Sequence, residues 1–208
     1  IYHVPLMLEE QGFCDILNID CEKTGLLDEW KTMAHRLDEL REEVNIAMVG
    51  KYTDLSDAYL SVIKSLQHAA LAVERKLNID WIEASDLEDD NNSEAWSLLR
   101  SANGVLVPGG FGDRGIEGKV LAAQYARENN VPYLGICLGL QVATIEFCRN
   151  VLGIKDATST EFDADAANPA VIFMPEISKT HLGGTMRLGS RPTIFQVDDC
   201  VTKRLYGG

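Results

Sequence analysis

The chain has 208 residues, of which 46% are hydrophobic and 25% charged, enough for one domain with a full core, with or without a short appendage. No apolar run reaches the roughly 18 residues of a membrane-spanning helix, and the start has no signal-peptide pattern, so we expect a cytoplasmic protein with no membrane partner. A net charge of −13 repels phosphate backbones, so no nucleic-acid partner is expected. The odd number of cysteines, without any Cys-x-x-Cys pair, argues against disulfides and a metal site: Cys14, Cys21, Cys137, Cys148 and Cys200.

The first predicted element is a helix over residues 28–43. Trp30, Met33, Leu37 and Leu40 recur there at helical spacing and form one apolar stripe. From residue 44 the sequence pattern changes. We therefore predict a domain boundary, with residues 1–43 as an N-terminal segment ending in a linker helix and residues 44–208 as the main domain.

Strands and helices are predicted to alternate after this boundary. Alternation of this kind predicts an α/β fold: a doubly wound, mostly parallel, flavodoxin-like sheet with helices on both faces. Functional sites in such folds gather at the carboxyl ends of the strands. Strands are predicted at 44–52, 79–84, 104–110, 131–137 and 170–175, helices at 57–77, 94–102, 116–129 and 138–152, and a hairpin or pair of loops at 183–197.

Two glycine motifs carry weak signals. Gly50-Lys51 follows a predicted strand, but it lacks the upstream glycine and the following Ser or Thr of a phosphate-binding P-loop. Residues 110–115 spell G-x-G-x-x-G, yet they follow the third strand and lack the acidic residue of a dinucleotide site. We expect the loop around Gly110 to bring bare backbone N–H groups close to a ligand instead.

The sharpest motif is Gly135-Ile136-Cys137-Leu138-Gly139, which has the G-x-nucleophile-x-G form where a predicted strand meets a helix. The glycines permit a sharp turn that strains the backbone of Cys137 and projects its side chain above the sheet. The N-terminus of the following helix favours the thiolate. We predict Cys137 as a nucleophile, with oxyanion donors at Leu138 and Gly110. The alternative is a small buried cysteine, the role expected of the other cysteines.

A wider set of segments carries a resemblance. The motifs LVPGGFG (106–112) and YLGICLGLQ (133–141) resemble class I, triad-type glutamine amidotransferases. Together with VGKYTDLSDAYLSV (49–62), STEF (159–162) and GGTMRLG (183–189), they resemble the glutaminase domain of the CTP synthase family. The opening residues 1–12 are similar to the tail of that family's synthase domain, which would make residues 1–43 synthase tail and linker helix.

The resemblance implies roles for individual residues. Cys137 matches the nucleophile that attacks the side-chain amide of glutamine and holds a glutamyl thioester. Gly110 matches the loop glycine that binds substrate and helps form the oxyanion hole. Glu161 matches a carboxylate for the α-ammonium of glutamine. The segment that contacts glutamine after the nucleophile matches Leu138, Gly139, Leu140 and Gln141.

The catalytic base is the one departure from the family pattern. The family supplies a histidine and its carboxylate in a His-Pro-Glu motif, but no Pro-Glu follows His3, His35, His68 or His181. Because the chain also starts at Ile1 without a methionine, we expect it to be part of a longer protein that carries the motif downstream.

The resemblance also implies partners and an overall reaction. It implies that ammonia from L-glutamine is delivered for ATP-dependent amination of UTP to CTP, a C–N ligase reaction of pyrimidine nucleotide biosynthesis. It implies no cofactor on this fragment, and ATP, Mg²⁺ and a GTP effector for the full-length enzyme. The expected partners are a synthase domain in the same chain and further copies in a homotetramer. Two alternatives stay open: the glutaminase domain of another class I amidotransferase, and a non-catalytic α/β regulatory or assembly module.

Overall fold

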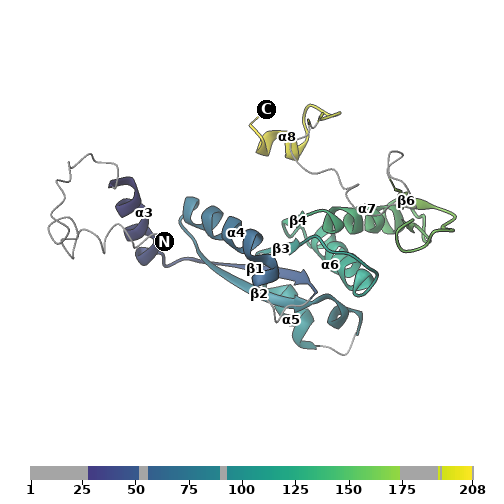
Figure 1. Ribbon diagram of the computed structural model, residues 1–208, viewed down its shortest axis with the longest axis horizontal. Coiled ribbons are helices and arrows are strands. Elements are labelled where there is room, and N and C mark those ends of the chain that lie inside the picture. Colours follow the sequence, from purple (N-terminus) through teal and green to yellow (C-terminus); the bar gives the residue numbers. More distant parts are fainter. Residues whose placement is uncertain (1–27, 52–55, 90–92, 174–191, 193, 208) are drawn as a thin grey trace, which may run out of the picture. The chain divides into compact units, whose positions relative to one another are not determined.

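The computed structural model describes residues 28–51, 56–89, 93–173, 192 and 194–207. The chain divides into two compact units, which meet in sequence between Ile172 and Phe173. The first unit holds a parallel sheet and the helices that cover it (Figure 1). In the part of the chain that the structure describes, no helix is both long and apolar enough to cross a membrane.

The main sheet has four parallel strands in the order β2-β1-β3-β4. The chain leaves β1 for β2 on one side and later enters β3 on the other side, so the winding reverses between β1 and β3. This reversal is the topological switch point of a doubly wound fold, and the predicted fold class is confirmed. The strands are β1 (Glu43–Gly50), β2 (Lys76–Glu83), β3 (Gly104–Val107) and β4 (Tyr133–Gly135).

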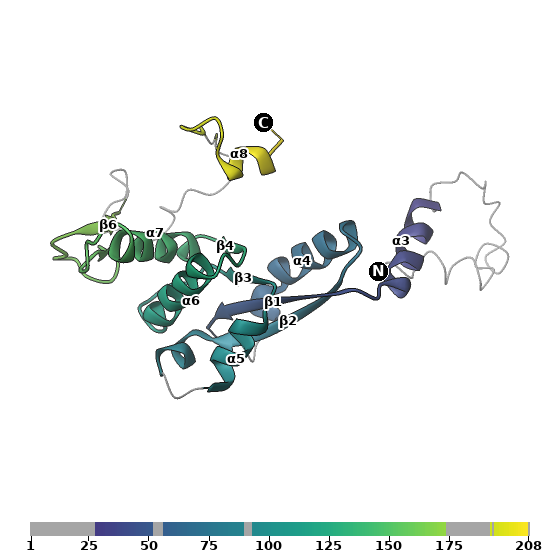
Figure 2. The same cartoon turned by 180° about the vertical axis from the view of Figure 1, so that it is seen from behind.

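Helices cover both faces of this sheet. Helix α4 (Leu60–Ala72), after the 3-10 turn η1 (Ser56–Tyr59), lies on the opposite face from α5 (Ser93–Ser101), as Figures 1 and 2 show. Right-handed crossovers place α4 and α5 on opposite faces, because the chain crosses from β1 to β2 in one direction and from β2 to β3 in the opposite direction. The face with α5 also carries η2 (Ala84–Glu88), α6 (Ile116–Glu128) and α7 (Leu138–Asn150).

The core follows from the alternation of side chains along the strands. Ala47 and Val49 of β1 and Val107 of β3 face α5, α6 and α7 and belong to the main buried cluster. Met48 and Leu106, which alternate with them, are 0% and 3% exposed on the other face. Strands buried on both faces explain why β1 and β3 appear in the sequence as short continuous apolar runs.

Most element boundaries differ from the prediction by a few residues, and two helices show the physical reason. The helix predicted over residues 57–77 ends at Ala72, because Leu77 pairs with Val44 in the parallel register of β1 and β2. The helix predicted over residues 28–43 is α3 (Asp28–Glu39), which ends earlier because β1 begins at Glu43. A helical apolar spacing does not show where an extended strand takes over, and the tertiary pairing decides it.

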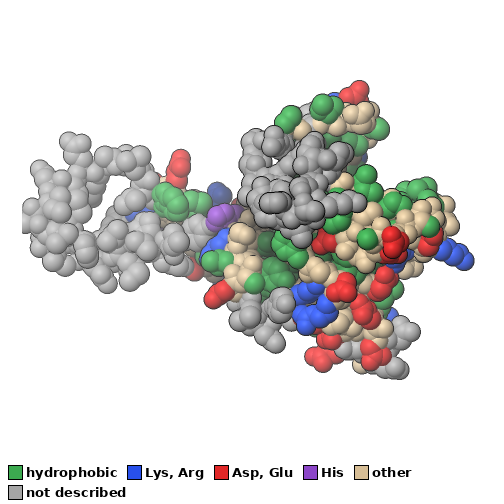
Figure 3. Space-filling model, turned by 45° about the vertical axis from the view of Figure 1, so that its right-hand side comes forward, with side chains coloured by type: hydrophobic (Ala, Val, Ile, Leu, Met, Phe, Trp, Pro, Cys, Tyr) green, Lys and Arg blue, Asp and Glu red, His purple; other side chains and the backbone are tan. Residues whose placement is uncertain are grey.

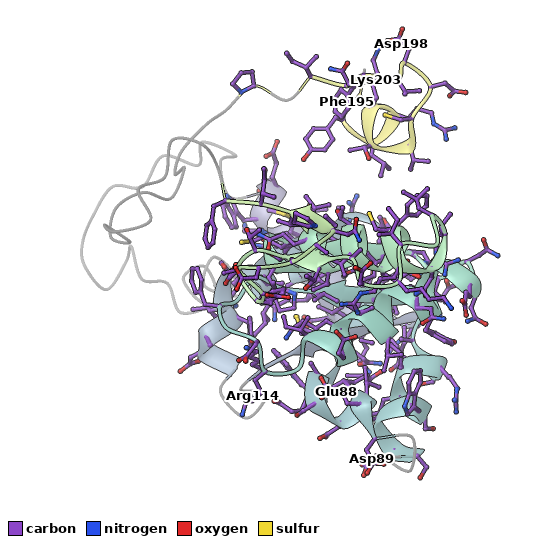
Figure 4. The ribbon with its side chains drawn as sticks, turned by 90° about the vertical axis from the view of Figure 1, so that its right-hand side faces the viewer. Glu88, Asp89, Arg114, Phe195, Asp198 and Lys203 are labelled. Atoms are coloured by element: carbon purple, nitrogen blue, oxygen red, sulfur yellow. The ribbon has the colours of Figure 1, made fainter. Side chains whose placement is uncertain are left out.

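The last part of the first unit carries a small parallel pair, β5 (Thr158–Ser159) with β6 (Pro169–Val171). Strand β6 covers the start of the strand predicted at 170–175, whose end lies outside the described residues. The hairpin predicted at 183–197 also lies largely outside them. In the second unit, helix α8 (Val201–Leu205) was not predicted. It is held by a Lys203–Asp198 ion pair of 2.6 Å (Figure 4).

Candidate active site

Cys137 occupies the turn between β4 and α7. Its backbone has φ 54° and ψ −105°, outside the regions that L-residues normally populate. Holding a side-chain-bearing residue there costs on the order of 1–3 kcal/mol, and such strain clusters at functional sites. The thiol itself is exposed. The strained turn expected from the sequence motif is therefore present.

Gly135 and Gly139 must be glycines, because neighbouring backbone atoms lie too close to them for any side chain. A Cβ on Gly135 would lie 2.6 Å from the Leu140 nitrogen, and a Cβ on Gly139 would lie 2.9 Å from the Val107 carbonyl carbon. Neither contact is possible, so only glycine lets β4 turn so tightly into α7 and lets α7 approach β3. The G-x-C-x-G spacing thus has a steric cause on both sides of the cysteine.

Hydrogen bonds fix the first turn of α7. The N–H groups of Leu140 and Gln141 donate to the Cys137 carbonyl at 3.1 and 3.2 Å. The Tyr133 hydroxyl donates to the Gly139 carbonyl at 2.7 Å, and burial raises the pKa of Tyr133, so it stays a donor. Leu138, the first residue of α7, has no intrahelical acceptor for its N–H. That N–H, next to Cys137, can serve a developing oxyanion.

The glycine loop after β3 lies beside the cysteine. A Cβ on Gly109 would be 3.3 Å from the Cys137 Cβ and 3.9 Å from its Sγ, and a Cβ on Gly110 would be 3.8 Å from Leu138 Cδ2. The loop thus meets the elbow at both predicted oxyanion donors, Leu138 and Gly110. Gly109 makes the nearer approach to the cysteine, which the sequence motif did not distinguish from Gly110.

A cavity of about 350 Å³ opens at the switch point between β1 and β3. Doubly wound folds bind ligands at this place. Two buried lysines stand in its wall, Lys51 just after β1 and Lys119 in the first turn of α6, 8% and 2% exposed. Sequence reasoning treated Gly50-Lys51 only as a weak phosphate-loop signal and gave neither lysine a role at the glutamine site. The lining is Gly50, Lys51, Ala58, Tyr59, Pro108, Gly109, Gly110, Phe111 and Lys119.

The electrostatics around the lysines are set by burial. Burial, followed by the neighbouring charge of Lys51, lowers the pKa of Lys119 from 10.5 to about 8, while Glu83 and Glu88 oppose the shift. Arg114, at the same end of the domain as Glu88 (Figure 4), pairs with Glu83 at 3.1 Å. Acidic side chains are prominent on the face in Figure 3, as the net charge of −13 requires.

The remaining candidate residues, Gln141, Leu140 and Glu161, differ in burial and in their position relative to Cys137. Gln141 lies in the first turn of α7, and its Oε1 is buried without a hydrogen-bond partner among the described residues. Leu140 is 62% exposed beside it. Glu161 is exposed in the turn after β5, with its N–H donating to Ser159 Oγ at 3.2 Å. No described contact joins Glu161 to Cys137.

No base can be assigned among the described residues. His35 on α3 and His68 on α4 are both exposed, and His3 and His181 lie outside the described part of the chain. In the described part, no group of three or more His, Cys, Asp or Glu could hold a metal ion. The described geometry therefore places an exposed thiol on a strained turn, beside the glycine loop of Gly109 and Gly110.

Known proteins resemble this chain over most of its length. A family model, glutamine amidotransferase class-I, matches residues 54–208. CTP synthase of Dictyostelium discoideum is 51% identical over 231 residues, covering 99% of this chain and 41% of the relative. Human CTP synthase 1 is 51% identical over 220 residues, covering 100% of this chain and 37% of the relative.

A solved structure matches as well. It is the glutaminase domain of Trypanosoma brucei CTPS with bound acivicin, with a TM-score of 0.61 and 45% identity, covering 66% of this chain and 53% of that chain. This chain belongs to the class-I glutamine amidotransferase family. It spans about two fifths of the length of the curated CTP synthases that it matches. The resemblance expected from the sequence is confirmed, and another amidotransferase or a non-catalytic module is not favoured.

Proposed function

We propose that this chain is the glutaminase domain of a CTP synthase and releases ammonia from L-glutamine. The observation that carries the proposal is the backbone of Cys137, strained at φ 54° with the Gly109–Gly110 loop beside it. Identity of 51% to CTP synthases over nearly the whole chain supports the choice of this amidotransferase over others.

The proposed reaction has two steps. The Cys137 thiolate attacks the carboxamide carbon of glutamine, while the N–H groups of Leu138 and Gly110 stabilise the oxyanion. The C–N bond then breaks, and ammonia leaves with the proton that the Cys137 thiol lost when it became the thiolate. Water hydrolyses the glutamyl thioester, which yields glutamate and restores the thiol.

Substrate binding is proposed for the polar groups around the elbow. Gln141, in the first turn of α7, is proposed to contact glutamine on the resemblance of the segment that follows the nucleophile. Leu138, Gly139 and Leu140 would line the same site. Glu161 is the candidate for the α-ammonium group, proposed from the STEF match.

The activity of the whole protein is part of the same proposal. The ammonia would serve ATP-dependent amination of UTP to CTP on a synthase domain of the same chain, with Mg²⁺ there and GTP as an effector. Homotetramers are the proposed assembly and the cytoplasm the proposed compartment. The described cysteines Cys137, Cys148 and Cys200 are all free thiols, which suits a reducing compartment.

The test uses the protein produced from its complete coding sequence. Cys137→Ser should abolish glutamine-dependent CTP formation and leave ammonia-dependent CTP formation unchanged. Cys148→Ser, which changes a half-buried thiol of the same helix, is the matched control and should retain both activities. A glutamine-mimicking diazo ketone or chloroketone should add one mass increment, mapped to Cys137. Glutamine hydrolysis retained in Cys137→Ser would refute the assignment.

A further inference from the structure

Hydrogen bonds from the two buried lysines hold the glycine loop of the proposed site. Lys51 Nζ donates to the Phe111 carbonyl at 2.9 Å and to the Gly112 carbonyl at 3.3 Å. Lys119 Nζ donates to the Gly115 carbonyl at 3.3 Å and to the Arg114 carbonyl at 3.5 Å. The two ammonium groups together bind both halves of the loop that follows Gly110.

This arrangement is costly for the fold. A buried cation loses its hydration, and carbonyl oxygens replace only part of it. Within the described residues, neither ammonium group forms an ion pair. The facing charges are otherwise engaged: Glu83 pairs with Arg114 at 3.1 Å, and Glu88 accepts from the Gly118 N–H at 3.1 Å. Apolar side chains would fill the same space at lower cost, so packing alone does not account for the lysines.

The position of Lys51 relative to the site indicates a functional reason for burying this cation. Its N–H and carbonyl are both bonded to the Tyr59 hydroxyl, so the residue is fixed at the end of β1. Phe111, whose carbonyl it binds, directly follows Gly110. The Phe111 carbonyl lies two peptide planes after the Gly110 N–H, so holding it limits the movement of the loop that carries this N–H. Oxyanion donors must be oriented before the reaction, because their reorientation would add to the barrier.

We propose that Lys51 and Lys119 are positioning residues of the glutaminase site: they hold the carbonyls of the glycine loop so that Gly110 keeps its oxyanion donor aligned with Cys137. The inference rests on the proposed function. The two lysines act through the loop, because both ammonium groups donate their hydrogen bonds to loop carbonyls. Their removal therefore affects the step in which the oxyanion forms, and leaves the thiol itself unchanged.

The test compares Lys51→Met and Lys119→Met with Lys64→Met in the protein from its complete coding sequence. Lys64 is an exposed lysine of α4 that bonds Gln67 at 3.1 Å, so it controls for the loss of one charge. Each buried-lysine variant should lower kcat for glutamine hydrolysis at least about tenfold, with KM changed less than about threefold. Lys64→Met should match the wild type.

Alkylation of Cys137 by iodoacetamide separates positioning from general damage, because this reaction needs a thiolate and no oxyanion hole. The alkylation rate should stay within about twofold of the wild type in both variants, while hydrogen exchange in residues 109–115 becomes faster. If Lys51→Met does not fold, Lys51→Gln, which keeps a shorter neutral donor, should show the same loss of kcat.

Three results would overturn the inference. Folded variants with wild-type kcat would show that the loop does not need the lysines. Equal losses of kcat and of alkylation rate would show a general structural role. A wild-type protein that neither hydrolyses glutamine nor reacts with the glutamine-mimicking electrophile would refute the proposed function first, and the inference with it.

Discussion

Gly139→Ala is the most direct test of the elbow geometry. The added Cβ would overlap the Val107 carbonyl oxygen and lie 2.9 Å from the Val107 carbonyl carbon, whereas ordinary carbon–carbon contacts are about 3.5–4.0 Å. Helix α7 would have to move away from β3 by about an ångström or more to relieve the overlap with this oxygen. Because the obstacle is backbone, the movement would loosen the packing of Leu138 and Val142, 1% and 0% exposed.

The expected cost can be estimated from this geometry. Overpacking costs typically 1–3 kcal/mol, and a backbone obstacle places this case near the upper end, at about 3 kcal/mol. For a chain of this size the midpoint of thermal unfolding falls by roughly 2–4 °C per kcal/mol. We therefore expect a decrease of about 6–12 °C, measured by far-UV circular dichroism.

The matched control for this measurement is Gly110→Ala. Its Cβ would meet only Leu138 Cδ2, at 3.8 Å, so the unfolding midpoint should stay within about 1 °C. The same variant should lower kcat/KM for glutamine, because the methyl group enters the proposed site. A Gly139→Ala midpoint as close to wild type as that of Gly110→Ala would refute the steric account of the motif.

Three further predictions test other parts of the structure. Cys137→Gly should raise the unfolding midpoint, because glycine adopts φ 54° without strain, with a net gain of about 1 kcal/mol; a lower midpoint would contradict strain at the elbow. In urea unfolding, Arg127→Met should lower the free energy of unfolding more than Glu146→Gln does, because the first variant leaves a carboxylate, 2% exposed, without its bidentate partner at 2.7 and 3.0 Å; the reverse order would refute this. Because the pKa of Lys119 is lowered from 10.5 to about 8, the unfolded chain binds more protons between these pH values, so stability relative to Lys119→Met should rise with pH there; parallel pH curves would disprove it.

The parts predicted well from the sequence depend on local chemistry. The apolar runs ending at Gly50, Val107 and Gly135 identified the parallel strands, because strands buried on both faces need continuous apolar residues. The elbow around Cys137 was identifiable because its two glycines are required by close backbone contacts, either within a few residues of the turn or with the neighbouring strand. Element ends were less predictable, as Leu77 shows: its apolar side chain suits a helix stripe or a strand equally well.

By itself, the sequence determined the α/β class, the strained cysteine and its position at a strand end. Only the tertiary structure decided which strand ends meet. The reversal of winding puts β1 next to β3. As a result, Lys51 lies within hydrogen-bonding distance of the loop that contains Gly110, and Gly109 lies against Cys137. These contacts join residues far apart in the chain, and no local spacing records them, because they depend on strand order and on where each crossover returns.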